Sequence, residues 1–564
     1  MNITRELLNL YVEKGFLTSE LSNQVFNDCK TAHVTLREYL LAKEYITEAA
    51  ELEVLSEFYN IPSVELELLN VDDDLIDLFS FEFMKKHKII PVRRDEDGTL
   101  ILATARPLDC HTISAISSRF CCKFDLVLVL PSQIDHFIDG KATKASTFKA
   151  ISDINTENDE KKQSAAQKGG SGPAISKEDD VINNPAVRLV DSIIKEAIPD
   201  HASDIHIEPF EKVVNVRYRI DGDLEKRASF PIEAFSAVCA RLKIMSGMNI
   251  AERRIPQDGR INLKIGDNEY DFRVSTLPTV FGEKFVIRIL DKRSFKFTRK
   301  DIGFTEDENL VVDKMLARPH GIILLTGPTG CGKSTTLYSF IKEVNDPTVN
   351  IVTVEDPVEY SMEGVNQTQV NTKANMTFAA ALRSILRQDP DIIMIGEIRD
   401  EETAEIAVRS AITGHLVFST LHTNDAVGAI TRLEDMGVDN YLVADALVGV
   451  IAQRLVKRLC PMCKSTGLTN EKEMEILGIN EPIEISRPCG CNFCGSTGYR
   501  GRIAVHEIMY MNENMKNAVL TEKNLEVLRK HATDNGMVSL WNSCVRLVKD
   551  GTTSIQELLT LKSE

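Results

Sequence analysis

Hydrophobic periodicity divides the start of the chain into a helical part and a mixed part. Residues 1–66 repeat apolar side chains three and four positions apart, which predicts helices. Residues 67–140 alternate more rapidly: 85–105 reads as a β-hairpin around an acidic turn with a glycine, and 127–133 reads as a further strand. We therefore expect an α+β domain over residues 1–140.

The stretch from 141 to 180 breaks this pattern. It has few large apolar residues and contains the run Gly169-Gly170-Ser171-Gly172-Pro173. Such a segment cannot bury enough apolar surface to order itself. The composition therefore predicts a flexible linker over 141–180.

Regular patterns return after the linker. An amphipathic helix is predicted from Pro185, and residues 213–222 and 261–277 alternate as strands, which indicates an α/β domain over 181–294. From Ile302 onward short apolar strands alternate with helices, as in a parallel sheet.

Bulk composition indicates a soluble protein of about three or four domains. Hydrophobic residues make up 43% and charged residues 27% of the 564 positions, which is ordinary for globular proteins. The net charge of −18 argues against direct nucleic-acid binding by the chain as a whole.

No apolar run reaches the roughly 20 residues that span a bilayer, so we expect no membrane insertion. The first residues carry Glu6 and Glu13 and lack a basic stretch followed by an apolar core, which argues against a secretory signal. A cytoplasmic protein is expected, with its 12 cysteines as reduced thiols or metal ligands.

A phosphate-binding loop is the clearest chemical motif. The buried-strand run 321–326 is followed by a G-x-x-x-x-G-K-[ST] pattern and then by a helix. Backbone N–H groups of such a loop and the helix N-terminus bind phosphate oxygens, while Lys333 binds the β/γ phosphates and Ser334 a Mg²⁺ ion. The alternative is a chance glycine-rich turn. The expected ATP-binding residues are Gly327, Pro328, Thr329, Gly330, Cys331, Gly332, Lys333, Ser334 and Thr335.

Two further apolar strands, 350–360 and 391–400, end in charged clusters. The first cluster holds Glu355, Asp356 and Glu359, and the second holds Glu397, Arg399 and Asp400. Ligands and metals gather at the carboxyl ends of parallel strands, so both clusters can reach the Mg²⁺ and the attacking water. For Asp356 helix capping is an equally good interpretation.

The order of these motifs resembles that of the secretion-ATPase superfamily of type II secretion and type IV pilus motors. The four boxes in question are the phosphate loop, TVEDPVEY, RQDPDIIMIGEIRD and TGHLVFSTLHTNDA. The resemblance extends from about residue 180 to 509 and implies a RecA-like P-loop ATPase core at 295–564. It also implies a preceding α/β (PAS-like) domain. It assigns water activation to Glu355, a Mg²⁺ ligand to Glu397 and γ-phosphate sensing to His415 and His422.

The resemblance further implies a homohexameric ring in which the middle domain supplies arginines across the subunit junction. Candidates are Arg217 and Arg219, with Arg254 and Arg260 as others; each is also readily interpreted as a structural arginine. An arginine supplied in trans stabilises charge during phosphoryl transfer.

Two C-x-x-C pairs, Cys460 with Cys463 and Cys491 with Cys494, have the spacing of a structural Zn²⁺ site at 460–494. A redox dithiol and an iron–sulfur site are the alternatives, and Cys489 is a possible substitute for Cys491. By the resemblance, a tetracysteine is typical of assembly motors rather than retraction motors. Cys331 in the phosphate loop is either an oxidation switch or a position that tolerates any small residue.

Residues 1–140 resemble the N-terminal domain of longer superfamily members, some of which bind cyclic di-guanylate through motifs opening with Arg-Leu-Gly. The nearest stretch, Thr35-Leu36-Arg37, lacks both that arginine and the glycine, so docking to a membrane-bound partner is favoured. The resemblance favours a type IV pilus assembly motor that acts through an inner-membrane platform protein, recruited to the inner face of the cell membrane. The alternatives are a type II secretion motor, a nucleic-acid translocase and a non-enzymatic nucleotide sensor.

Overall fold

The computed structural model describes two long stretches of the chain. They are residues 2–141, with gaps at 33–35, 44, 67–68, 70, 77–78, 96–97, 109–111, 114–115, 117–122, 136 and 139–140, and residues 185–563, with gaps at 266–267 and 292–296. Apart from Lys141, the predicted linker lies outside the described residues. These residues group into two compact units, one of 1–261 with 272–289 and one of 262–271 with 290–564.

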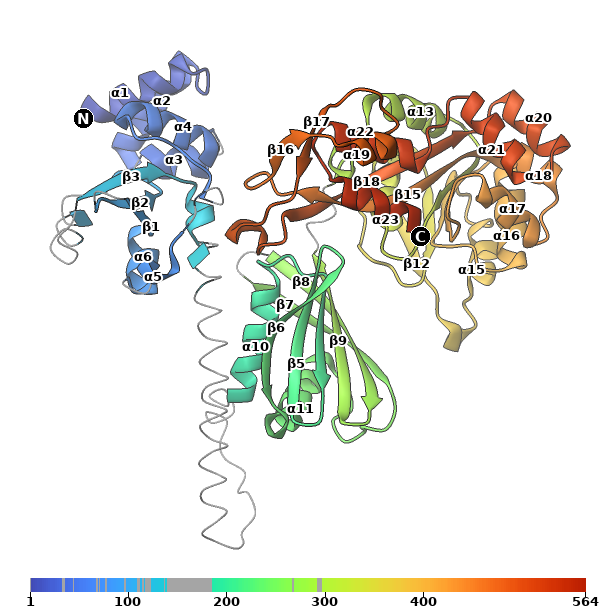
Figure 1. The fold of residues 1–564 in the computed structure, drawn as a ribbon, viewed down its shortest axis with the longest axis horizontal. Helices are drawn as coiled ribbons and strands as arrows, with labels where there is room; N and C mark the ends of the chain where they lie inside the picture. The colour runs from blue at the N-terminus through green and yellow to red at the C-terminus, as the bar shows by residue number, and fades with distance from the viewer. Residues whose placement is uncertain are drawn as a thin grey trace, which may run out of the picture. The chain divides into compact units, whose positions relative to one another are not determined.

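The N-terminal part of the first unit combines helices with a small sheet, as predicted (Figure 1). The helices are α1 (Asn2–Glu13), α2 (Ser19–Ala32), α3 (Leu36–Ala42), α4 (Glu48–Tyr59), α5 (Asp73–Ile76) and α6 (Phe81–His87). The strands are β1 (Ile89–Arg94), β2 (Leu100–Thr104) and β3 (Phe124–Leu128). β1 pairs antiparallel with β2, which confirms the predicted hairpin, and β2 pairs parallel with β3. The strand predicted over 127–133 is wrong in its bounds, because β3 ends at Leu128 and residues 131–135 are helical. The two central turn residues of the hairpin, 96 and 97, lie outside the described residues.

The rest of this unit forms a six-stranded sheet with two α-helices, and residues 262–271 complete two of the strands. The helices are α10 (Pro185–Ala197) and α11 (Phe235–Ser246), with a short 3-10 turn, η2 (Ile232–Ala234). The strands are β4 (Asp204–Pro209), β5 (Val213–Ile220), β6 (Asp223–Pro231), β7 (Gln257–Ile265), β8 (Asn268–Thr279) and β9 (Gly282–Asp291). Their order is β6-β5-β4-β9-β8-β7, and β4, the third strand, pairs antiparallel with both its neighbours. The helix predicted from Pro185 and the alternating strands are confirmed.

The second unit is built on a seven-stranded sheet. Its strands are β10 (Gly321–Thr326), β11 (Ile351–Glu355), β12 (Val365–Gln369), β13 (Ile392–Ile395), β14 (Leu416–Leu421), β15 (Leu447–Leu459) and β18 (Tyr499–Tyr510). The order is β12-β11-β13-β14-β10-β15-β18, parallel throughout except for the last pair. The parallel sheet predicted from residue 302 onward is therefore confirmed.

Helices cover both faces of this sheet (Figure 1). Alternate residues of β10 enter two separate cores, with Ile322 and Leu324 in one and Ile323 and Leu325 in the other. The first core includes α15 (Phe378–Ile385), α16 (Glu401–Ile412), α17 (Gly428–Asp435), α18 (Asn440–Ala446), α20 (Glu513–Thr521) and α21 (Leu525–Asp534). The second includes α13 (Glu306–Leu316) and α14 (Lys333–Val344). A strand buried on both faces explains the unbroken apolar run GIILLT.

The remaining elements connect or extend these layers. They are α12 (Arg299–Ile302), η4 (Thr372–Ala374), β16 (Ser465–Leu468), α19 (Glu471–Leu477), β17 (Glu484–Arg487), η5 (Asn492–Cys494), α22 (Leu540–Lys549) and α23 (Ile555–Ser563). Among the described residues, no helix is both long enough and apolar enough to cross a bilayer.

Candidate active site

The phosphate loop lies between the buried strand β10 and the helix α14, as the motif predicts. Gly332, at the N-cap of α14, has φ 90°, a conformation that side chains rarely adopt. A Cβ at Gly327 would lie 2.5 Å from the backbone oxygen of Gln453, so that position has no room for a side chain. Glycine is therefore required at both positions for the loop to keep this shape.

Lys333, the first residue of α14, lies inside the loop. Its Nζ donates to the backbone oxygens of Gly327 at 2.6 Å and of Pro328 at 3.0 Å. The side chain is buried, and burial lowers the pKa of Lys333. Ser334, the next residue, is exposed and so accessible to a ligand.

Glu355, the last residue of β11, is 3% exposed and accepts three hydrogen bonds. Thr353 Oγ1 donates to its Oε1 at 2.6 Å, Gln367 Nε2 donates to the same oxygen at 3.1 Å, and the Tyr338 hydroxyl donates to Oε2. Burial, with the nearby Glu355 charge, raises the pKa of Tyr338, which keeps this hydroxyl protonated as a donor. The carboxylate of Glu355 is thus fixed in one orientation.

Glu397 follows β13 and contacts two neighbouring side chains. Arg399 Nη2 lies 2.5 Å from its Oε1, and His422 Nε2 lies 3.4 Å from its Oε2. The ion pair with Glu397 raises the pKa of Arg399. Because His422 is half exposed, its ring is open to a ligand on the side away from Glu397.

These residues meet at one edge of the sheet because β11, β13, β14 and β10 are neighbouring parallel strands. In register, Val354 of β11 faces Ile395 of β13, and Leu421 of β14 faces Thr326 of β10. Strands lie about 4.8 Å apart, so the backbone of β11 lies about 14 Å from β10 and that of β13 about 10 Å. The edge therefore presents Glu397 between Glu355 and the phosphate loop.

The two histidines of the last box lie at opposite ends of β14. His422 follows its carboxyl end, beside the loop, whereas His415 precedes its first residue. The backbone oxygen of His415 accepts from Gly321, the first residue of β10, and its Nδ1 lies 2.9 Å from the Ser410 oxygen. Within one chain, the γ-phosphate contact expected of His415 is therefore not possible, since a whole strand separates it from the loop.

The arginines predicted to act on a neighbouring subunit form ion pairs and hydrogen bonds within their own domain, residues 181–294. Arg217 on β5 forms an ion pair with Glu208 at 2.8 Å, and Arg219 lies 3.8 Å from Asp204 and donates to Gly222 O. Each remains about one third exposed.

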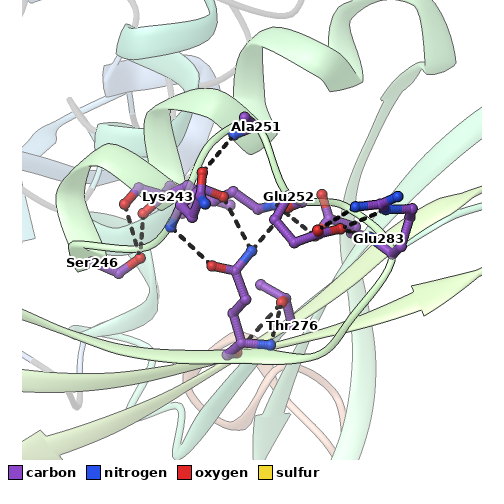
Figure 2. Close-up of polar contacts among 10 residues, drawn as sticks. Lys243, Ser246, Ala251, Glu252, Thr276 and Glu283 are labelled. Carbon is purple, nitrogen blue, oxygen red and sulfur yellow. Dashed lines mark hydrogen bonds and ion pairs between the residues drawn. The ribbon is translucent and has the colours of Figure 1, made fainter.

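Arg254 lies in the loop 247–256, which is shaped by buried polar contacts (Figure 2). Lys243, 1% exposed, forms an ion pair with Glu283 at 2.7 Å, and its Nζ donates to the Glu252 oxygen at 2.5 Å. The Glu252 carboxylate in turn binds Arg254, whose side chain is 87% exposed.

The four predicted cysteines come together. The sulfur atoms of Cys460, Cys463, Cys491 and Cys494 all lie within 4.8 Å of one another, with three separations of 3.8–3.9 Å. Four thiolates around Zn²⁺, with bonds of about 2.3 Å at tetrahedral angles, have sulfurs about 3.8 Å apart. The four residues therefore fit a tetrahedral metal site.

Backbone N–H groups surround these sulfurs. Gly490 N points at Cys463 Sγ, and Cys491 N and Gly498 N point at Cys494 Sγ, each at 3.2 Å. Burial alone would raise the pKa of Cys494, but the two N–H donors, together with the neighbouring thiols of Cys491 and Cys463, lower it to about 7. Such donors stabilise thiolates, the form that binds metals.

The sequence left two interpretations open for each of two other cysteines, Cys489 and Cys331. Cys489 is exposed and points its thiol at Ser465 Oγ at 3.2 Å, so Cys491 and not Cys489 completes the four-sulfur cluster. Cys331 is 4% exposed, and burial raises the pKa of its thiol despite the adjacent helix N-terminus. The structure thus favours a small buried residue over an oxidation switch.

Several residues of the site were not identified from the sequence. Those that hold Glu355 are Tyr338, Thr353 and Gln367, and those beside the phosphate loop are Gln453 and Arg454. The last two interrupt the apolar strand run VIAQRLV near the residue that pairs with the end of β10. Polar residues at such a strand end are the one pattern that could have indicated them.

The fold and the phosphate loop together define a P-loop ATPase with a RecA-like core. The Type II/IV secretion system protein family matches residues 179–560, and the MshEN domain matches residues 59–140. The chain therefore belongs to the Type II/IV secretion system protein family and is an ATP hydrolase of that family.

Curated relatives and solved structures agree with this assignment. The type II secretion system protein E of Pseudomonas aeruginosa is 47% identical over 392 residues, 69% of this chain and 77% of that protein. The type IV pilus assembly ATPase PilB of Myxococcus xanthus is 40% identical over 521 residues, 91% of each chain. The ATPase DotB of Legionella pneumophila shares the fold, with a TM-score of 0.50 at 19% identity over 70% of this chain and 98% of that chain.

Proposed function

We propose that this chain hydrolyses ATP at the carboxyl edge of its seven-stranded sheet and uses the energy to drive pilin assembly, that is, type IV pilus extension. The observation that carries the proposal is the convergence of the phosphate loop, Glu355, Glu397 and His422 on that single edge.

Each residue has a distinct chemical role. Lys333 and the loop N–H groups bind the β and γ phosphates, and Ser334 with Glu397 would hold the Mg²⁺ that ATP hydrolases of this kind use. Glu355 accepts the proton of the attacking water. His422, which lies beside Glu397 and is half exposed, contacts the γ-phosphate.

The pilus role rests on how far the pilus relative matches. PilB of Myxococcus xanthus aligns over 91% of both chains, including the N-terminal part. A type II secretion motor is the second candidate, since the protein E of Klebsiella pneumoniae is 42% identical over 86% of this chain and 97% of that protein.

Motors of either kind act on a membrane machine from the cytoplasm. We propose a cytoplasmic homohexamer, recruited to the inner face of the membrane through a platform protein. In this ring Arg217 and Arg219 leave their partners Glu208 and Asp204 to approach the neighbour's ATP. We also propose that Cys460, Cys463, Cys491 and Cys494 hold one structural Zn²⁺.

The biochemical test is Lys333→Ala in the full-length chain, followed by ATP binding and phosphate release. Loss of the fixed charge inside the loop should abolish hydrolysis and weaken ATP binding. Arg546→Ala, at an exposed position of the same unit, is the control and should keep wild-type values. Unchanged turnover in Lys333→Ala would contradict the assignment of the loop.

The cellular test separates the two motors. The gene is deleted in its own host, and surface pilin and secreted proteins in the medium are both measured. Loss of surface pilin with normal secretion, restored by the wild-type gene but not by Lys333→Ala, is expected. Loss of secretion with normal pili would establish the type II secretion role instead.

A further inference from the structure

Gln453 on β15 contacts both the phosphate loop and the first turn of α14. Its side chain is 1% exposed, its Nε2 donates to the Cys331 oxygen at 2.8 Å, and its Oε1 accepts from Thr336 Oγ1 at 2.8 Å. A Cβ at Gly332 would lie 2.8 Å from the same Nε2. One amide group thus bonds to the middle of the loop and to the helix that follows it.

Arg454, the next residue, is 6% exposed and lies between the start of the loop and another part of the site. Its Nη1 donates to the Gln453 oxygen at 3.1 Å and would lie 3.0 Å from a Cβ at Gly327. Its Nη2 donates to the backbone oxygen of Asn424 at 3.2 Å and to its Oδ1 at 3.3 Å. Asn424 lies two residues after His422, so one guanidinium spans the start of the loop and the histidine turn.

The position of these residues follows from the sheet. β15 is the parallel neighbour of β10, with Ala452 opposite Thr326 in register. Gln453 and Arg454 therefore extend past the end of β10, where the phosphate loop begins. Neighbouring side chains of a strand point to opposite faces of the sheet. The side chains of Gln453 and Arg454 nevertheless both have polar partners at this edge, so neither is buried in apolar surroundings.

We propose that Gln453 and Arg454 are positioning residues of the ATP site. Gln453 holds the phosphate loop in its binding shape, and Arg454 keeps the His422 turn aligned with that loop while adding positive charge beside Lys333. The proposal rests on the function proposed above, with ATP bound at this loop.

The first experiment measures the Kd for ATP, KM and kcat of the full-length chain with Gln453→Ala, Gln453→Glu and Thr336→Val. Gln453→Ala removes two hydrogen bonds between buried groups and should raise Kd and KM about tenfold, with a smaller change in kcat. Gln453→Glu keeps the acceptor for Thr336 and should recover part of the loss. Either variant alone breaks the hydrogen bond between Thr336 and Gln453, so the double variant should lose less than the sum of the two single effects. Only the longer bond from Thr336 Oγ1 to the Gly332 oxygen, at 3.3 Å, is still lost when Thr336→Val is added to Gln453→Ala.

The second experiment addresses Arg454. Arg454→Met should lower kcat about tenfold or more, since the histidine turn loses its hydrogen bonds to the strand beside the loop, and Arg454→Lys should restore part of it. Gln556→Ala and Arg546→Met are exposed matched controls in the same unit and should match wild type. Thermal unfolding of each variant shows how much protein is folded.

The outcomes are distinguishable. A purely structural role predicts a lower Tm with wild-type Kd and KM in the folded fraction, and that result would overturn the proposal, as would additive effects of Gln453→Ala and Thr336→Val. If Gln453→Ala does not fold, Kd and KM are measured on the near-isosteric Gln453→Glu. Wild-type values of both in that variant would likewise overturn the proposal. Wild-type ATP binding by Lys333→Ala would instead show that the ATP site itself has been assigned to the wrong loop.

Discussion

Replacing Glu355 by glutamine tests the assignment of the water-activating base. The amide keeps the size of the carboxylate but cannot accept a proton from water. General base catalysis contributes about 10²–10⁴ in rate, so hydrolysis should fall by that factor, or about 2.7–5.4 kcal/mol in activation free energy. ATP binding should persist, because the phosphate loop is unchanged.

The structure predicts a second, separate effect of this substitution. Glu355 accepts from Thr353, Gln367 and Tyr338, and a glutamine side chain has only one oxygen to face these donors. One bond to a buried charged group is lost, which should lower the free energy of unfolding by about 1.5–3 kcal/mol. Tyr338→Phe removes the same bond while leaving the carboxylate, and therefore serves as the matched control.

The assay combines phosphate release, ATP binding and thermal unfolding for Glu355→Gln, Tyr338→Phe and Glu359→Gln. Both Glu355→Gln and Tyr338→Phe should be less stable than wild type, but only Glu355→Gln should lose hydrolysis by two orders of magnitude or more. If Glu359→Gln stops turnover while Glu355→Gln stays within a few-fold of wild type, the wrong carboxylate has been chosen. Equal losses of rate in Glu355→Gln and Tyr338→Phe would indicate that the rate follows stability and not proton transfer.

Three further predictions concern metal, assembly and recruitment. Metal analysis should find one zinc per chain; Cys460→Ser should lose it and lower Tm, while Cys489→Ser, at the exposed thiol outside the cluster, should keep it. Iron instead of zinc, or no metal in freshly reduced protein, would contradict the site. Mixing Lys333→Ala chains with Arg217→Ala/Arg219→Ala chains should restore some activity, because some junctions of a mixed ring join an intact loop to intact arginines; a fully active dilute monomer would refute the shared site. Deleting residues 1–140 should leave substantial ATPase activity but abolish membrane recruitment in cell fractionation. Loss of ATPase activity with retained membrane association would contradict the roles proposed for the two parts of the chain.

The site could be predicted where the chemistry is local in sequence. The phosphate loop and the charged ends of two strands were identifiable because parallel strands place their carboxyl ends along one edge, and the cysteine pairs because their spacing is that of a metal site. The different positions of His415 and His422 could also have been predicted from the sequence. The run LVFSTL between His415 and His422 is itself a strand, so its two ends lie on opposite edges of the sheet.

The residues that orient the site were not predictable in the same way. Tyr338 lies 17 positions from Glu355, and Gln453 lies 117 positions from Thr336. These bonds depend on which strand lies beside which, and the sequence indicates that strands are parallel but not their order. A glutamine in an apolar strand run also has no pattern that reveals its partner, since only the folded sheet brings the loop to it.

The cysteine-bearing segment 460–494 and the C-terminal helices share one hydrophobic core. Leu477 of α19 and Ile485 of β17 pack in the same cluster as Val548 of α22 and Leu558 of α23. Lys464, next to Cys463, also donates to the backbone oxygen of Gly551. Segments that share a core open together, so segment 460–494 and the last two helices should form a single cooperative unit whose amides exchange with solvent as one group. Substitution of the cysteines should therefore also destabilise the C-terminal helices, and a destabilising substitution in those helices should also destabilise segment 460–494.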